Sequence, residues 1–307
     1  MQSKITTLKI RPHFEYRVWA GNKIKKIYNL EEKSIGEAWI ISAYKNKSSI
    51  ITNLEQEISL LDFYNNKNNA NFFNNYNLKH EYPLLTKIID AKQDLSVQIH
   101  PDNEYAKEFN SLGKTECWYI LDTNKNNSIV LGHNANSLDE FKNMVENKEW
   151  KKLLKEKPIK KGDFIYVEST KIHAIKSNTL IFELQQSSDI TYRVYDYDRL
   201  DNGKPRELHL DHVYKLVKTP DVTLEPKEIS NKKDFFVANN LFNLQMIKNK
   251  GKNEYHYSEA QWVQICVIEG KGKINNIDAK KFDCFLIAHN QSIDIDGNLK
   301  CLVSFVK

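Results

Sequence analysis

The chain has 307 residues and a formal net charge of +5 at pH 7, from 45 Lys and Arg against 40 Asp and Glu. This length is enough for one large domain or two medium ones with a substantial core. The basic excess is mild and includes no stripe of basic residues with interleaved aromatic ones, which argues against nucleic-acid binding but still favours a small anionic substrate.

The N-terminal quarter predicts short strands followed by a loop. The segments TTLKI, KKIYNL and EAWIISAY have a β-like composition and are separated by turn-forming residues. Residues 65–77 (NNKNNANFFNNYN) contain too few aliphatic side chains for a core element. We therefore expect a surface loop between short helices there.

The most informative stretch is Leu95–Asp102 (LSVQIHPD), which follows a buried strand predicted over 82–90. Its apolar residues alternate with Ser96, Gln98 and His100, which is the period of a strand with one apolar and one polar face. Gln98 and His100 therefore project to the same side and could hold a metal together. For this segment alone, the alternative is an edge strand whose polar face meets water.

The next strand adds a carboxylate to the polar face. Asp102 can cap a short helix after the first strand. Residues 114–121 (KTECWYIL) then resume the strand pattern and place Lys114 and Glu116 on one side. The candidate site thus gains an acidic group.

The segment 161–175 has the pattern of half a cupin barrel. A Gly-Asp turn leads into the strand FIYV, and a second turn delivers His173. The following strand, LIFELQQ over 180–186, carries Glu183 on its polar face. The polar density of residues 187–199 (SSDITYRVYDYDR) indicates the wall of a site.

The remaining segments predict helices, a linker and further strands. Ser137 begins a capping box before a packing helix over 138–154, and another short helix ends near Val217. Residues 219–230 have the composition of a linker. From Phe235 the pattern is β to the end, and it repeats the cupin half-pattern without a matching set of ligand residues.

We therefore expect an all-β fold of two cupin barrels (double-stranded β-helices, or jelly rolls) with a few short helices inserted. A catalytic metal-binding domain with helical insertions is expected over 1–225 and a degenerate C-terminal cupin domain over 226–307. The four cysteines are scattered, and no run approaches the roughly 18 apolar residues that span a bilayer. Reduced thiols in a cytoplasmic protein fit best.

Two imidazoles, one carboxylate and one amide make up the candidate metal site: Gln98, His100, Glu116 and His173. Nitrogen and oxygen donors without thiolate suit zinc or another borderline divalent ion, with a position open for water or substrate. Each residue alone is weak evidence, because a lone histidine in a β-protein is more often a satisfied core or surface group. Their order on alternating strand faces predicts a metal site.

Several motifs together resemble the short bacterial class of type I mannose-6-phosphate isomerases, the zinc-dependent phosphomannose isomerases of the cupin superfamily. These motifs are LSVQIHPDNEYA, GKTECWYIL, KGDFIYVESTKIHAI, LIFELQQSSDITYRVYDYDR and GKPRELH. The likeness runs in order from about Arg17 to His209. The C-terminal segment resembles the family only in general pattern.

The resemblance implies one zinc ion per chain and a sugar phosphate as substrate. Mannose 6-phosphate and fructose 6-phosphate would be interconverted through a cis-enediolate. The implied zinc ligands are Gln98, His100, Glu116 and His173. Beside the substrate the resemblance places Ser96, Lys114 and Arg193, and Asp189 matches an acidic residue proposed to move protons in some members.

The chain departs from the family pattern at two places. Larger members have a histidine where this chain has Gly113, so a role for that histidine in ring opening does not carry over. Glu168, Thr170 and Lys171 replace the usual turn before His173. This leaves the geometry of the turn open, though not the ligand.

The residue types also suit aldose–ketose isomerisation by themselves. The reaction removes a proton beside a carbonyl and returns it to the neighbouring carbon, and a metal stabilises the charge that develops on the two oxygens. Arg193 stays protonated near neutral pH, so it suits stabilising the enediolate or gripping phosphate. Asp189, Lys114 and Glu183 remain the acid/base candidates, and Glu183 suits orienting a ligand or Arg193 equally well.

Two other functions compete with the isomerase. An iron-dependent cupin dioxygenase more often has a His-x-His pair with Glu and a third His, whereas Gln98 takes the first position here. A non-catalytic metal-cupin sensor of sugar phosphates would keep the fold and lose turnover, and the complete ligand set with Arg193 argues against it. We expect no nucleic acid, membrane or obligate protein partner.

Overall fold

The structure is a computed structural model that describes residues 5–31, 34–224, 229–230, 232 and 234–307. Its elements are mostly antiparallel strands with short helices between them, which confirms the expected β class at this level. No helix in these described ranges is long and apolar enough to cross a membrane. Part of the predicted linker, residues 225–228, lies outside the described residues.

The chain forms two compact units that do not follow a single linear division. The first unit takes in the described parts of Met1–His13, Trp39–Thr86 and Glu225–Lys307. The second consists of Phe14–Ala38 and Lys87–Leu224. The sequence-based domain boundary at 225/226 stays a prediction. The two units alternate along the chain because strands far apart in sequence pair within the first unit.

The first unit is built on a ten-stranded sheet. Its path of paired strands is β17(Phe235–Ala238), β18(Asn243–Asn249), β23(Ile293–Phe305), β20(Val263–Ile274), β22(Cys284–Ile287), β1(Thr7–Arg11), β4(Ile50–Ile51) and β5(Ile58–Ser59), with β19(Lys252–Tyr255) on β23 and β21(Ile277–Lys280) on β20. Its core includes Val267, Phe285 and Phe305. Burying a side chain of this size contributes about 1.5–3 kcal/mol.

The Asn-rich stretch of the first unit is helical, so the prediction of a loop was wrong. After α2(Leu60–Asn65), the chain forms the 3-10 helices η1(Lys67–Phe73) and η2(Tyr76–Leu78). Phe72 and Phe73 are buried, and the ring of Phe73 meets Trp262 edge-on with centroids 5.2 Å apart. Two aromatic side chains thus anchor a segment that lacks aliphatic residues.

The second unit contains two larger sheets and a short hairpin. The five-stranded sheet has the order β10(Leu154–Ile159), β9(Asn127–His133), β12(His173–Ala174), β7(Val97–Ile99) and β14(Tyr192–Tyr195). The six-stranded sheet has the order β11(Phe164–Val167), β8(Glu116–Thr123), β13(Thr179–Gln186), β6(Leu84–Ala91), β3(Ile35–Ser42) and β2(His13–Tyr16), and the unit boundaries fall within or beside its last three strands. The hairpin pairs β15(Leu200–Asp201) with β16(Lys204–Pro205).

One segment of the second unit, KKIYNL, is a helix where its composition predicts a strand. Residues Lys23–Tyr28 form α1. The carboxylate of Asp90, on β6, accepts hydrogen bonds from the backbone amides of Lys23 and Ile24 at 2.5 and 3.3 Å. These amides begin the helix and have no partner inside it, so a carboxylate from a distant strand stabilises the helix start.

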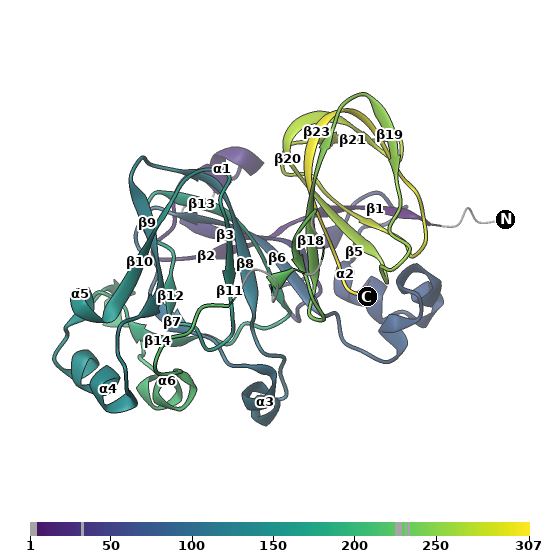
Figure 1. Cartoon of the computed structure of the whole chain (residues 1–307). Coiled ribbons are helices and arrows are strands. Elements are labelled where there is room, and N and C mark those ends of the chain that lie inside the picture. Colours follow the sequence, from purple (N-terminus) through teal and green to yellow (C-terminus); the bar gives the residue numbers. More distant parts are fainter. Residues whose placement is uncertain (1–4, 32–33, 225–228, 231, 233) are drawn as a thin grey trace. The chain divides into compact units, whose positions relative to one another are not determined.

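Three helices of the second unit cover one face of the five-stranded sheet (Figure 1). They are α4(Leu138–Glu146), α5(Trp150–Leu153) and α6(Leu210–Leu216), while α3(Asn103–Ala106) and η3(Lys107–Phe109) follow β7. As expected, Ser137 and Asp102 cap α4 and α3. The helix predicted over 138–154 is interrupted, because Lys148 adopts the left-handed conformation with φ +55°.

The alternation at β7 decides what faces the interior between the two sheets. Val97 and Ile99 pack into the apolar cluster under the helices. A second apolar cluster, which includes Trp118 and Ile181, draws its members from both sheets and fills the space between them. Gln98 lies between its two apolar neighbours in the strand and therefore points into this inner space.

Candidate metal centre and adjoining cavity

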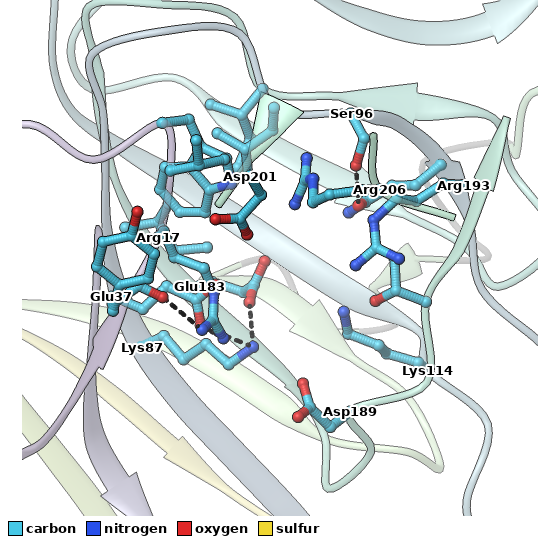
Figure 2. Close-up of a pocket in the computed structure, with 18 residues that line it drawn as sticks. Arg17, Glu37, Lys87, Ser96, Lys114, Glu183, Asp189, Arg193, Asp201 and Arg206 are labelled. Atoms are coloured by element: carbon cyan, nitrogen blue, oxygen red, sulfur yellow. Dashed lines mark hydrogen bonds and ion pairs between the residues drawn. The ribbon is translucent and has the colours of Figure 1, made fainter. Parts of the chain in front are cut away.

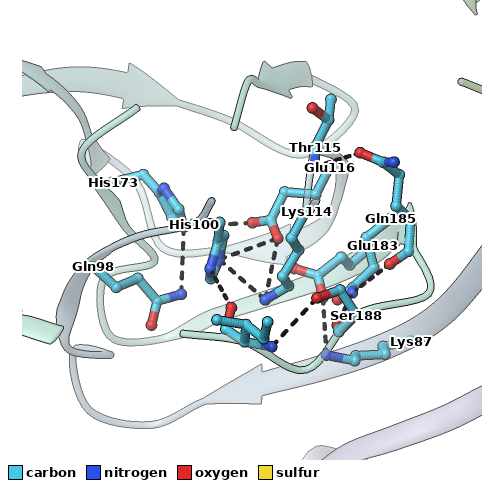
Figure 3. A network of polar contacts seen from close by, with 12 residues as sticks. Lys87, Gln98, His100, Lys114, Thr115, Glu116, His173, Glu183, Gln185 and Ser188 are labelled. Atoms are coloured by element: carbon cyan, nitrogen blue, oxygen red, sulfur yellow. Dashed lines mark hydrogen bonds and ion pairs between the residues drawn. The ribbon is translucent and has the colours of Figure 1, made fainter. Parts of the chain in front are cut away.

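Three strands bring the predicted ligands to one place. His173 on β12 is the direct cross-strand partner of Gln98 on β7. His100 follows β7 directly, and Glu116 opens β8 in the opposite sheet. Figure 3 shows these side chains converging from the two sheets. The convergence that strand alternation predicts is therefore present in the fold.

A compact group of two imidazoles and one carboxylate lies at this point. One potential ligand atom from each of His100, Glu116 and His173 lies within 4.8 Å of the others. The Glu116 Oε2 atom is 3.4 Å from His100 Nε2, and its Oε1 atom is 3.5 Å from His173 Nε2. All three residues are buried. Buried Glu116 Oε2 has no hydrogen-bond partner among the described residues, a situation that a bound cation would relieve.

Backbone carbonyls set the tautomers of both histidines. His100 Nδ1 lies 2.9 Å from the carbonyl oxygen of Ile190, and His173 Nδ1 lies 2.8 Å from that of Lys171. A carbonyl can only accept, so both rings carry hydrogen on Nδ1 and turn an Nε2 lone pair towards Glu116. Burial lowers the pKa of His173 to about 4 and holds the pKa of His100 well below its usual value. The neutral imidazole is the form of histidine that can bind a metal ion.

Gln98 and Lys114 border the cluster. The amide nitrogen of Gln98 lies 3.3 Å from His173 Nε2, and its oxygen accepts a hydrogen bond from Ser96 Oγ at 3.3 Å. The ammonium of Lys114 lies 3.0 Å from His100 Nε2 and 3.4 Å from Glu116 Oε2. Gln98 thus turns its nitrogen to the cluster in this structure, and the amide must rotate to present its oxygen to a metal.

A tryptophan links the cluster to a second carboxylate. Trp118 Nε1 donates to Glu116 Oε1 at 3.1 Å and to Glu183 Oε2 at 3.0 Å. Burial, with the negative charge of Glu116 adding to it, raises the pKa of Glu183 to about 7. One indole N–H therefore holds the two carboxylates in fixed positions.

A buried lysine continues this network, and sequence reasoning missed it. Lys87 Nζ lies 3.4 Å from Glu183 Oε1 and 3.7 Å from Glu37 Oε2, and Arg17 holds Glu37 through two hydrogen bonds of 2.7 and 3.1 Å. Burial lowers the pKa of Lys87, but Glu37 and Glu183 outweigh it, so the net shift is upward. A signal was available, because a lysine inside the apolar run LLTKIID needs a buried partner.

A cavity of about 430 Å³ opens beside the cluster. Its lining includes every predicted residue outside the histidine–glutamate group: Ser96, Gln98, Lys114, Glu183, Asp189 and Arg193. Figure 2 shows Ser96, Lys114, Glu183, Asp189 and Arg193 around one open space. The lining of the cavity also includes Arg206, which lies in the motif GKPRELH and to which sequence reasoning assigned no role. A small polar molecule in this cavity would therefore lie beside Gln98 and Lys114, which border the histidine–glutamate group.

The two departures from the family pattern have structural explanations. A side chain at Gly113 would place its Cβ 2.6 Å from the backbone of Asp102 and Asn103, so only glycine fits there. In the turn before His173, Thr170 has φ +66° and its amide donates to the carbonyl of His100 at 2.7 Å. This hydrogen bond holds a β-branched residue in a conformation that it rarely adopts.

The chain resembles known proteins along most of its length. The family description "Phosphomannose isomerase type I, catalytic domain" matches residues 8–145. The chain is 36% identical over 311 residues to the probable mannose-6-phosphate isomerase GmuF of Bacillus subtilis, covering 96% of this chain and 98% of the relative. It is 35% identical over 312 residues to mannose-6-phosphate isomerase ManA of the same bacterium, covering 96% and 97%.

Solved structures show the same likeness. The crystal structure of the mannose 6-phosphate isomerase from Bacillus subtilis superposes with a TM-score of 0.89 at 34% identity, covering 98% of this chain and 100% of that one. A putative mannosephosphate isomerase from Archaeoglobus fulgidus has a TM-score of 0.80 at 17% identity, covering 100% and 99%, and supports the fold alone.

Proposed function

The chain belongs to the type I mannose-6-phosphate isomerase family, and from this premise we propose that it interconverts mannose 6-phosphate and fructose 6-phosphate with one zinc ion per chain. The observation that carries the proposal is the buried group of His100, Glu116 and His173 at the edge of a polar cavity. Its nitrogen and oxygen donors fit zinc, and Gln98 is the proposed fourth ligand. The sensor and dioxygenase alternatives have no comparable support.

In the proposed reaction the sugar's carbonyl and neighbouring hydroxyl lie against the metal group. A bound zinc ion would supply Lewis acidity to these two oxygens and so favour a cis-enediolate. The protein's own residues orient the sugar and move the proton between its first two carbons. Ser96 and Arg193, which line the cavity, are the proposed substrate contacts.

The candidates for proton transfer are Lys114, Glu183 and Asp189, which line the cavity and can each bind or release a proton. The fixed contacts of Glu183 with Trp118 and Lys87 suit a group that positions others as well as one that transfers a proton. Substituting the base is expected to lower kcat by about 10²–10⁴-fold. Loss of deuterium exchange from solvent into the sugar product in Glu183→Gln or Asp189→Asn identifies which carboxylate acts.

We further propose that the second unit, Phe14–Ala38 with Lys87–Leu224, is the catalytic cupin barrel and that the first unit contains a degenerate one. Among the described residues, the group at His100, Glu116 and His173 is the one cluster of potential ligands, which supports a structural role for the other barrel. The sequence-based division into 1–225 and 226–307 places all four proposed metal ligands in its first part. A cytoplasmic location and the absence of an obligate partner stay predictions.

A coupled assay tests the function directly. Protein treated with chelator and then supplied with zinc should convert mannose 6-phosphate to fructose 6-phosphate, detected through a coupled dehydrogenase. Chelated protein without added metal should be inactive. If the zinc-loaded protein does not turn over, the isomerase assignment is wrong. If it binds the sugar phosphate without turnover, the sensor is correct.

A further inference from the structure

Three arginines, Arg17, Arg193 and Arg206, line the cavity beside the histidine–glutamate group, and one of them is not neutralised. In the described part of the chain, no hydrogen bond or ion pair engages the guanidinium of Arg193, and its buried Nε has no partner. Hydrogen bonds engage its backbone instead, because the amide donates to His209 Nδ1 at 3.1 Å and the carbonyl accepts from the amide of His209 at 2.9 Å. A half-buried guanidinium without a partner is costly unless an anion joins it.

Arg206 faces the same cavity and is held rigidly by a carboxylate. Its Nε and Nη2 atoms donate to the two oxygens of Asp196 at 2.8 and 2.5 Å. Asp196 is buried and also accepts a hydrogen bond from Arg199 at 2.6 Å. The paired arrangement uses two of the three guanidinium nitrogens of Arg206 and leaves Nη1 for a ligand. An arginine fixed in this way loses little conformational freedom when a ligand binds.

The other cations of the lining are already paired. Arg17 pairs with Glu37, Lys87 contacts Glu37 and Glu183, and Lys114 contacts the metal group. Figure 2 shows Arg193, Arg206 and Lys114 on one side of the opening, with Glu37, Glu183 and Asp201 across from them. Positive charge in excess therefore remains at Arg193, and next to it Arg206 shares the single carboxylate of Asp196 with Arg199.

The electrostatics of Arg193 agree with this geometry. Burial lowers the pKa of Arg193, and the nearby positive charge of Arg206 lowers it further. Two guanidinium groups close enough to repel each other in a partly buried cavity are stabilised by an anion that both can contact. A phosphate monoester, which carries about two negative charges near pH 7 and three acceptor oxygens, matches two forked donors.

We propose that Arg206 binds the phosphate group of the substrate together with Arg193, and that Asp196 positions Arg206 for this contact. That the ligand is a sugar phosphate rests on the proposed function. The proposal that Arg193 and Arg206 bind an anion does not depend on that function. Arg206 is thus a specificity-determining residue that selects phosphorylated over free sugars. Asp196 is a positioning residue, because it touches Arg206 and not the ligand.

The test combines kinetics with direct anion binding to the zinc-loaded protein. Arg206→Gln should raise both KM for mannose 6-phosphate and the Kd of inorganic phosphate, which calorimetry measures. Each constant should rise about tenfold to a hundredfold, because this is the range expected for one lost hydrogen bond between charged groups. The kcat should change by less than about threefold, because the reacting carbons lie at the metal group. Arg11→Gln, at an exposed arginine paired with Glu57, is the matched control and should change neither value.

Two further variants keep the test decisive. Arg206→Lys retains the positive charge and loses the planar pair of guanidinium donors, so it should give smaller increases in KM and Kd. This variant replaces Arg206→Gln in the test if Arg206→Gln does not fold. Asp196→Asn should raise KM while zinc content and kcat stay near wild type, a split that a general loss of stability would not produce. Unchanged phosphate Kd and KM in both folded Arg206 variants would overturn the proposal. If wild type binds phosphate through Arg206 but does not isomerise, the anion site stands and the proposed function fails.

Discussion

The carbonyl oxygen of Lys171 accepts a hydrogen bond from Nδ1 of His173 at 2.8 Å. This contact leaves the Nε2 lone pair of the ring facing Glu116. The side chain of the same lysine is held by Asp221, whose Oδ1 lies 2.8 Å from Lys171 Nζ. A residue beyond the last helix of the second unit therefore helps to fix the orientation of a proposed zinc ligand.

Replacing Asp221 by Asn should weaken zinc binding. The ion pair that holds Lys171 is lost, so the turn before His173 becomes less constrained, and partners of this kind typically change metal affinity by about 10–100-fold. Competition with a chromophoric chelator measures the affinity. Lys155→Gln is the matched control, because Lys155 is a more exposed partner of Asp221 at 3.4 Å and its loss leaves the ion pair between Asp221 and Lys171 in place. Equal zinc affinities for Asp221→Asn and wild type would contradict the prediction.

Removing a ligand should remove the metal. His100→Ala and Glu116→Ala each delete one donor of the buried group, so stoichiometric zinc should disappear from elemental analysis while circular dichroism still shows a folded chain. His256→Ala, at an exposed histidine of the first unit, should retain one zinc per chain. Zinc retained at full stoichiometry in either ligand variant would remove that residue from the site.

Replacing Lys87 by Met should destabilise the second unit strongly. The ammonium lies buried between Glu37 and Glu183, so its loss removes the cation that contacts buried Glu183 and leaves Glu37 with the charge of Arg17. Breaking a buried ion pair from one side costs about 3–5 kcal/mol in the free energy of unfolding. Urea denaturation measures it. Lys160→Met removes an exposed partner of Asp163 and should cost less than about 1 kcal/mol. Similar urea midpoints for the two variants would argue against the network.

Acid should destabilise the protein partly through Asp196. Burial raises the pKa of this carboxyl, but hydrogen bonds from Arg206 and Arg199 outweigh it, so the folded-state pKa is lowered. The unfolded chain then binds the proton more readily, with a pKa of about 3.9. The resulting stability is complete above that value and is lost as pH falls through the folded pKa.

Asp196→Asn removes this titration. Its free energy of unfolding should therefore fall less steeply than that of wild type as pH drops below about 4. Urea denaturation at a series of acidic pH values gives the two slopes. Asp122→Asn is the control, because this half-exposed carboxyl pairs with Lys23 at the surface and should leave the slope near wild type. Parallel slopes for Asp196→Asn and wild type would count against the assignment.

Local sequence predicted strands better than it predicted helices. Apolar and alternating strand patterns identified β6, β8 and β13, and capping residues identified the starts of α3 and α4. The same reasoning failed for KKIYNL, because Asp90, which caps that helix, lies more than sixty residues away. It also failed for the Asn-rich stretch, where Phe73 packs against the distant Trp262.

By itself, the sequence determined the ligand types of the candidate site and the strand faces that carry them, because alternation is a property of neighbouring residues. The tertiary structure decided which distant charges meet. It buried Lys87 between Glu37 and Glu183 and fixed Arg206 on Asp196. It also chose the tautomers of His100 and His173 through the carbonyls of Ile190 and Lys171. These interactions depend on distances across the fold, which the spacing of residues along one strand does not contain.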